Sequence, residues 1–73
     1  MQYKNLGKYI RKKRLLLGIS LNAFALNSDI DPATLSNFET GKSGISFDTF
    51  TKIAKGFNLV ASELLLQYEK ENK

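Results

Sequence analysis

The chain has 73 residues, a net charge of +4, 42% hydrophobic residues, and neither cysteine nor histidine. Its length allows one small domain over residues 1–73, and its hydrophobic content is ordinary for a globular protein. Without cysteine it can form no disulfide or thiolate metal site, and without histidine it lacks the commonest general base and metal ligand. We therefore expect no enzyme, no metal and no other cofactor.

Hydropathy along the chain argues against a membrane protein. No apolar run approaches the roughly 20 residues that a membrane span needs, and the N-terminus shows no signal-peptide pattern. The expected location is the cytoplasm.

Positive charge is concentrated at the N-terminus: residues 1–18 contain several basic residues and no acidic one. Their basic residues are Lys4, Lys8, Arg11, Lys12, Lys13 and Arg14. Such asymmetry favours a polyanionic partner. A solvated helix face explains the same charges, and composition alone leaves both interpretations open.

Residues 5–17 predict a first helix. Leu6, Ile10 and Leu17 recur with a 3.6-residue period and predict its buried face. Arg14 falls on that face too. A guanidinium facing a core needs an anion beside it, because burying an unpaired charge costs several kcal/mol. Glu39 is a candidate for that anion.

A second helix is predicted over residues 21–27. Gly18 ends the first helix, and Ser20 is a suitable N-cap for the second. Only residues 28–30 then separate it from the next helix, so the two must cross steeply. Ala25 is small enough to permit that crossing.

The third helix is predicted to run from Pro32 to about Thr40. Asp31 is its cap, proline suits its first position, and Gly41 supplies a left-handed residue after its end. Its outward side chains are small.

Two further helices are predicted over about 47–57 and 61–70, with Asn58 taking the place of a terminating glycine. The residues expected to face inward in the first of these are Phe47, Phe50, Ile53, Ala54 and Phe57. No segment alternates with strand periodicity, so the predicted fold is all-α, a compact bundle of five short helices.

These elements resemble the Cro/cI-type (XRE-like) helix-turn-helix family of regulators. The resemblance rests on "IRKKRLLLGIS", "LNAFAL", "TLSNFETGK" and "FTKIAKGFNLVASELL". It extends from Leu6 to Leu65 and implies a lambda-repressor-like DNA-binding domain, with the helix-turn-helix at about residues 20–40. The implied partner is double-stranded DNA.

The resemblance also implies roles for individual residues. In the family, the residues at Arg14 and Glu39 form an ion pair that anchors the recognition helix. Base-reading positions fall on Pro32, Ala33 and Asn37. Of these, only Asn37 can make a bidentate contact, with adenine, and its alternative is a solvated polar residue. The expected phosphate contacts are Leu21, Asn22, Thr34, Thr40, Lys42 and Ser43.

Three positions depart from the family pattern. Leu21 stands where a glutamine is common, Asp29 where a turn glycine is common, and Val60 where a serine or aspartate usually caps the last helix. Asp29 can still adopt the left-handed conformation.

A homodimer is expected, because one such domain covers only a half-site. The candidates for its interface are Ile45, Val60, Leu64, Leu65 and Tyr68. The alternative is that all of them pack inward. Such compactness resembles both restriction–modification controller proteins and small phage repressors.

A rival function keeps the same fold but makes it a protein-binding module, an antitoxin or regulatory subunit with DNA contact secondary. The weak base-reading side chains support it. Steeply salt-dependent DNA binding would favour the regulator.

Overall fold

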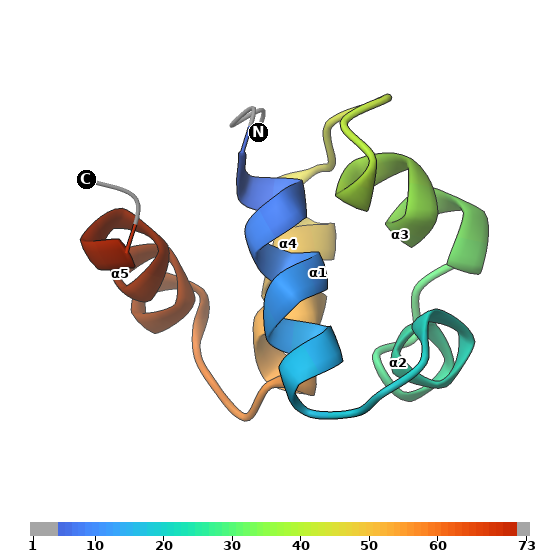
Figure 1. Ribbon diagram of the computed structural model, residues 1–73, viewed down its shortest axis with the longest axis horizontal. Coiled ribbons are helices and arrows are strands. Elements are labelled where there is room, and N and C mark those ends of the chain that lie inside the picture. The colour runs from blue at the N-terminus through green and yellow to red at the C-terminus, as the bar shows by residue number, and fades with distance from the viewer. Residues whose placement is uncertain (1–4, 72–73) are drawn as a thin grey trace.

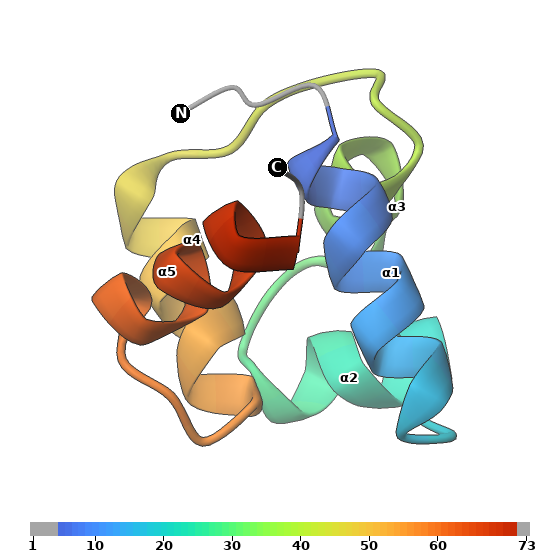
Figure 2. The same cartoon turned by 60° about the vertical axis from the view of Figure 1, so that its left-hand side comes forward.

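The computed structural model describes residues 5–71, which form five α-helices and no strand. The helices are α1 (Leu6–Leu16), α2 (Leu21–Asn27), α3 (Pro32–Glu39), α4 (Phe47–Gly56) and α5 (Ala61–Glu71). In Figure 1, α1 and α4 lie at the centre, with α2 and α3 on one side and α5 on the other; the turned view of Figure 2 shows α5 in front of α4 and α3 behind α1. The all-α prediction is confirmed. Lys4 lies outside the described residues.

Local capping signals explain where three helices begin. The side chains of Ser20, Asp31 and Ser46 each accept the backbone N–H three residues on, at 3.1–3.2 Å. Such caps satisfy donors that have no partner inside the helix. At Val60, which cannot cap α5, the Glu63 carboxylate instead accepts the Val60 N–H at 3.1 Å.

Left-handed residues explain how the helices end. Gly18 and Gly41 have φ of 71° and 79°, while Asp29 and Asn58 have φ of 57° and 62°. The last two take a conformation that favours glycine, which their short polar side chains tolerate. Asp29 therefore preserves the turn between α2 and α3, as the sequence predicted.

The core draws side chains from every helix. Its fully enclosed members are Leu6, Ile10, Phe24, Ala25, Leu35, Phe50, Ile53, Ala54 and Leu64. Within residues 5–71, no helix is long and apolar enough to cross a membrane.

Two residues predicted to face inward lie on the surface. Leu17 is 58% exposed and Phe47 is 63% exposed. Leu17 follows the last residue of α1, where the chain turns through Gly18, and Phe47 is the first residue of α4. The helical period predicts toward which side of the helix a side chain points. Burial also requires another element to pack against that side chain at its position along the helix axis, and no element covers these two side chains at the helix ends.

Candidate nucleic-acid interface

Helix α3 has a buried face and an exposed face of different character. Leu35, Phe38 and Glu39 point into the protein. The exposed side chains are Pro32, Ala33, Thr34 and Asn37. Asp31 accepts the Thr34 N–H at 3.2 Å and so fixes the start of the helix. The outer surface is therefore low in relief, and the exposed Asn37 amide is not bonded by any other residue within 5–71.

An ion pair holds α3 to α1 from behind. Arg14 Nε donates to Glu39 Oε2 at 2.9 Å, and its Nη2 donates to Oε1 at 2.8 Å. The third nitrogen, Nη1, donates to the Ile19 carbonyl oxygen at 2.7 Å. Arg14 is 4% exposed and Glu39 is 3% exposed. One guanidinium thus joins α1, α3 and the turn before α2.

The electrostatics of this pair favour the charged arginine. Its hydrogen bonds to Glu39 raise the pKa of Arg14 further above the ordinary value, although burial acts in the opposite direction. Both carboxylate oxygens of Glu39 are occupied by the guanidinium. Glu39 therefore has a structural role, as the sequence predicted, and offers no free carboxylate for catalysis.

A close backbone contact adds to this anchor. Gly7 is buried where α1 meets α3, and a Cβ added there would overlap the carbonyl oxygen of Phe38. Only glycine fits this approach without moving a helix. The Gly7 contact and the Arg14–Glu39 pair together set the distance and angle of α3 against α1.

The loop after α3 exposes Lys42 and Ser43. Their backbone N–H groups both donate to the Asn37 carbonyl oxygen, at 2.9 and 3.3 Å, so the loop is closed against the helix end. The Thr40 hydroxyl donates to the Ser36 carbonyl oxygen at 2.9 Å. Thr40 consequently has no free hydroxyl proton for a phosphate in this conformation, unlike Lys42 and Ser43.

The start of α2 offers backbone donors. The Ser20 hydroxyl accepts the Ala23 N–H, which leaves the N–H groups of Leu21 and Asn22 without a partner in the helix. Asn22 is exposed and Leu21 is partly buried. The sequence-predicted phosphate residues thus lie at the start of α2, on α3 and in the loop that follows α3.

Comparison with known proteins agrees with this arrangement. A protein-family model described as helix-turn-helix matches residues 10–65. The chain is 32% identical over 71 residues to the control protein C.MunI of a Mycoplasma species, covering 97% of this chain and 93% of that one. This chain belongs to the XRE-like helix-turn-helix family of transcription regulators.

Solved structures show the same fold. Two crystal structures of the clp gene regulator ClgR from Corynebacterium glutamicum superpose with TM-scores of 0.77 and 0.78, at 21% and 22% identity. The matches cover 96% and 93% of this chain, and 91% and 72% of the ClgR chains. In the matched helix-turn-helix, α3 is the second helix, the one that the family's terms call the recognition helix.

The structure changes the expected dimer surface of the regulator. Ile45 is 6% exposed and Leu64 is fully buried, so both belong to the core of one chain and the expectation that they meet a partner is wrong. Leu65 and Tyr68 are partly buried against that core. Val60 remains 60% exposed. Leu66, the neighbour of Leu65 on α5, is 52% exposed.

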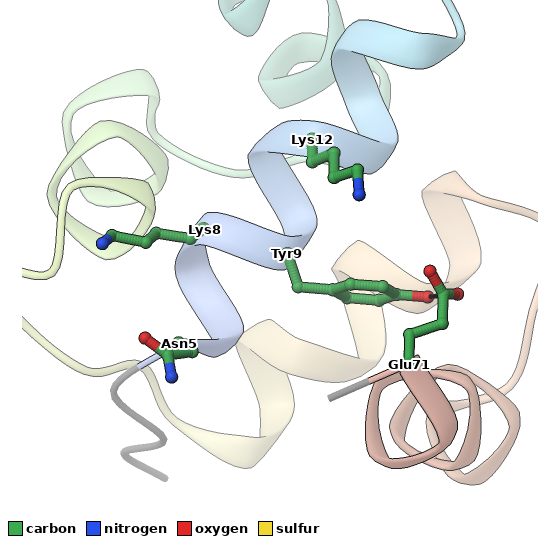
Figure 3. A pocket seen from close by; sticks show the side chains of 5 residues that line it. All are labelled: Asn5, Lys8, Tyr9, Lys12 and Glu71. Carbon is green, nitrogen blue, oxygen red and sulfur yellow. Dashed lines mark hydrogen bonds between the residues drawn. The ribbon is translucent and has the colours of Figure 1, made fainter. Parts of the chain in front are cut away.

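On the side away from α3, polar contacts join α1 to α5. The Tyr9 hydroxyl donates to Glu71 Oε2 at 2.8 Å, and Lys13 Nζ donates to Gln67 Oε1 at 2.9 Å. The rings of Tyr9 and Tyr68 meet edge to face at 5.6 Å. Figure 3 shows the Tyr9 ring reaching toward Glu71 beside a small cavity of about 210 Å³. Burial, assisted by Glu71, raises the pKa of Tyr9 to about 12.

Sequence reasoning missed Gly7 and Tyr9. The sequence contained a signal for each residue. A glycine inside a helix weakens it and usually has a packing reason, which applies to Gly7. Tyr9 lies three residues after the core residue Leu6 and therefore on a neighbouring part of the same helix face. The basic residues Lys8, Arg11 and Lys12 lie on the exposed side of α1.

Proposed function

We propose that this chain binds double-stranded DNA as a homodimer, at an operator with two-fold symmetry, and thereby regulates transcription in the cytoplasm. The observation that carries the proposal is the two-sided construction of α3. Its inner face is fixed by a buried bidentate ion pair, while its outer face presents small side chains and one free amide. A helix that must enter the major groove closely needs both properties.

Sequence reading is assigned to the exposed face of α3. The amide of Asn37 can bond adenine N6 and N7 together, and it is the base reader we expect to matter most. Pro32 and Ala33 can offer only apolar contact, for instance with a thymine methyl group. Sequence-dependent DNA shape supplies the remaining specificity.

Phosphate binding is assigned to the groups on either side of that helix. Lys42 contributes a full charge, and Ser43 and Thr34 contribute hydroxyls. The N–H groups of Leu21 and Asn22 are further donors to phosphate. Thr40 joins this set only if its hydroxyl turns away from Ser36.

Dimerisation follows from the size of the reading surface. One domain covers a half-site, and two domains related by a two-fold axis read half-sites about one helical turn apart. Val60 and Leu66 supply exposed apolar area for such an interface, and Leu65 and Tyr68 lie beside it on α5.

The control protein C.MunI supports the regulatory part of the proposal. The match covers nearly the whole of both chains, and the name of that relative describes a controlling role. The relatives are regulators, so they give no support to an enzymatic function.

Selection from a random duplex pool, followed by titrations in a salt series, tests the proposal. We expect an enriched palindromic site whose affinity falls by about a thousandfold or more between roughly 50 and 200 mM salt, as for a protein that neutralises several phosphates. An enriched site without symmetry would refute the dimeric operator. If no motif is enriched and binding is weak, the protein-binding module becomes the better explanation.

Two substitutions separate base reading from phosphate binding. Asn37→Ala should relax the base preference at one base pair per half-site. It should weaken the binding free energy for the best site by about 1–3 kcal/mol and leave binding to other sequences unchanged. Lys42→Ala should weaken all sequences alike and reduce the salt slope by about 1 per subunit. If Asn37→Ala weakens all duplexes equally, its assignment as a base reader is wrong.

One substitution on α5 tests the dimer. Leu66→Ser should shift the equilibrium toward monomer in sedimentation experiments, while the monomer keeps its stability within about 0.5 kcal/mol because the side chain is exposed. Leu26→Ser on α2, where the leucine is 80% exposed, is the matched control. An unchanged association constant for Leu66→Ser would place the interface elsewhere.

A further inference from the structure

The outer face of α1 combines positive charge with exposed leucine. Lys8, Arg11, Lys12, Leu15 and Leu16 recur at helical spacing and line a shallow groove of about 480 Å³. We call these five residues the cationic leucine face. Charge occupies its N-terminal half and apolar surface its C-terminal half. In Figure 1 no other helix lies in front of α1.

None of the five residues of this face belongs to the buried core of the described chain. The core residues of α1, Leu6 and Ile10, lie on the opposite side of the helix by its 3.6-residue period. Leu15 is 50% exposed and Leu16 is 78% exposed. A partner that removed the exposed part of these leucines from water would be stabilised by the apolar surface buried.

The charges on this face are unpaired. No ion pair joins Lys8, Arg11 or Lys12 to a carboxylate in residues 5–71. Glu71, at the end of α5, lines the neighbouring cavity together with Lys12. Its carboxylate accepts a hydrogen bond from the Tyr9 hydroxyl, on the side of α1 that faces α5 (Figure 3). The face therefore offers three cations to a partner from outside.

Most of the face lies away from the side of α1 that meets α3, which Gly7 and Arg14 mark. By helical spacing Lys12 and Leu16 point away from that side, whereas Arg11, four residues after Gly7 and three before Arg14, lies at its border. Phosphate would satisfy the cations but gain nothing from two leucines. A partner that satisfies both must carry acidic and apolar groups together.

The charge pattern also argues against a second copy of the chain. A two-fold contact brings the same patch of both subunits together. Here a parallel pair of helices would oppose cations with cations, and an antiparallel pair would set the cations of one copy against the leucines of the other, so neither arrangement supplies an anion to the cations.

We propose that the cationic leucine face docks an acidic amphipathic helix of a partner protein. Two apolar side chains of that helix enter the groove beside Leu15 and Leu16, and its carboxylates pair with Lys8, Arg11 and Lys12. Because α3 remains uncovered, the regulator holds DNA and this partner at the same time. The inference does not depend on the proposed operator.

Selection of a displayed library of random peptides, each about 16 residues long, on the full chain tests the docking surface. We expect enriched peptides to place leucine or phenylalanine at helical spacing among aspartate and glutamate. The best peptide is then synthesised, labelled and titrated by fluorescence anisotropy. Failure to enrich acidic amphipathic sequences would overturn the proposal.

Charge reversal and apolar truncation then locate the binding site. Arg11→Glu should raise the peptide Kd at least about tenfold, and Leu16→Ser about fivefold, without change in melting temperature because both side chains are exposed. The matched controls, Lys55→Glu on α4 and Leu26→Ser on α2, should leave the Kd unchanged. Equal effects of test and control variants would mean nonspecific attraction and reject the site.

Other occupants are distinguished in the same series. Saturable binding to vesicles of phosphatidylglycerol and phosphatidylcholine that is lost in Leu16→Ser would replace the protein partner with a membrane. Self-association lost in Leu16→Ser would replace it with a second copy. A saturating concentration of duplex DNA should change the peptide Kd by less than about twofold, and displacement of the peptide by DNA would show that the face belongs to the nucleic-acid interface.

Discussion

Helix α1 has polar contacts on both sides, and the two sides differ in how far they exclude water. Toward α3, Arg14 and Glu39 form a bidentate pair in which both residues are at least nine-tenths buried. Toward α5, Tyr9 bonds an exposed glutamate and Lys13 bonds a partly buried glutamine. The two sides therefore differ both in chemistry, an ion pair against hydrogen bonds with one neutral partner, and in dielectric environment.

This difference predicts unequal energetic consequences. Removing one member of a buried ion pair leaves an uncompensated charge, which costs several kcal/mol, whereas a solvent-accessible hydrogen bond contributes about 1 kcal/mol. We therefore expect the recognition helix to be held rigidly and α5 to be the more easily displaced element.

The largest effect should come from breaking the buried pair. Glu39→Ala should lower the free energy of unfolding by about 3 kcal/mol, because the Arg14 guanidinium then remains buried without its anion. Urea denaturation measures this loss. In the double variant Arg14→Met with Glu39→Leu, much of it should return, since no charge is stranded. Unchanged stability of Glu39→Ala would contradict a structural role for the pair.

A smaller loss is expected from the backbone contact on the same side. Gly7→Ala should lower the free energy of unfolding by about 1–3 kcal/mol, because the added methyl group overlaps the Phe38 carbonyl and α1 or α3 must move. Since that movement also displaces the recognition helix, affinity for DNA should fall as well. Lys12→Ala, on the exposed side of α1, is a control that should leave unfolding unchanged. Equal melting curves for both variants would show that the contact is readily relaxed.

The smallest effect belongs to the α5 side. Tyr9→Phe should lower the free energy of unfolding by about 1 kcal/mol at neutral pH, because the hydrogen bond to Glu71 is lost. In the wild-type protein the free energy of unfolding should fall by about 2 kcal/mol as the pH rises from 10 to 12. In that interval the unfolded tyrosine releases its proton while the folded one, with a pKa of about 12, retains it.

Denaturation at several pH values isolates that contribution, because Tyr9→Phe keeps every lysine but lacks the tyrosine proton. The stability advantage of the wild-type protein over Tyr9→Phe should therefore vanish and then reverse as the pH approaches 12. A constant difference across the interval would mean that the folded and unfolded tyrosines titrate alike.

The sequence predicted best what short segments determine. Ser20 and Asp31 cap their helices, and Asn58 adopts the left-handed conformation, because these preferences depend on a few neighbouring atoms. The Arg14–Glu39 pair was also predictable, since a charge on a buried face demands a partner. These features account for the element order and for the anchor of the recognition helix.

Sequence reasoning failed where burial depends on a distant element. Leu64 was expected on a dimer surface, yet it is fully buried in its own core. Ile45 is enclosed in the same core, although it lies in a loop with no periodicity to indicate its direction. The fit of Gly7 against Phe38 depends on how two helices cross, which no single-helix pattern contains.

The separation between the two faces of α3 has a consequence for how such regulators diverge. The side chains of Pro32, Ala33 and Asn37 are exposed, while Leu35, Phe38 and Glu39 carry the packing. Substitutions on the outer face therefore leave the scaffold intact, and substitutions on the inner face do not. A duplicated gene can thus acquire a new target by changing a few codons for one helix, without first having to regain a stable fold.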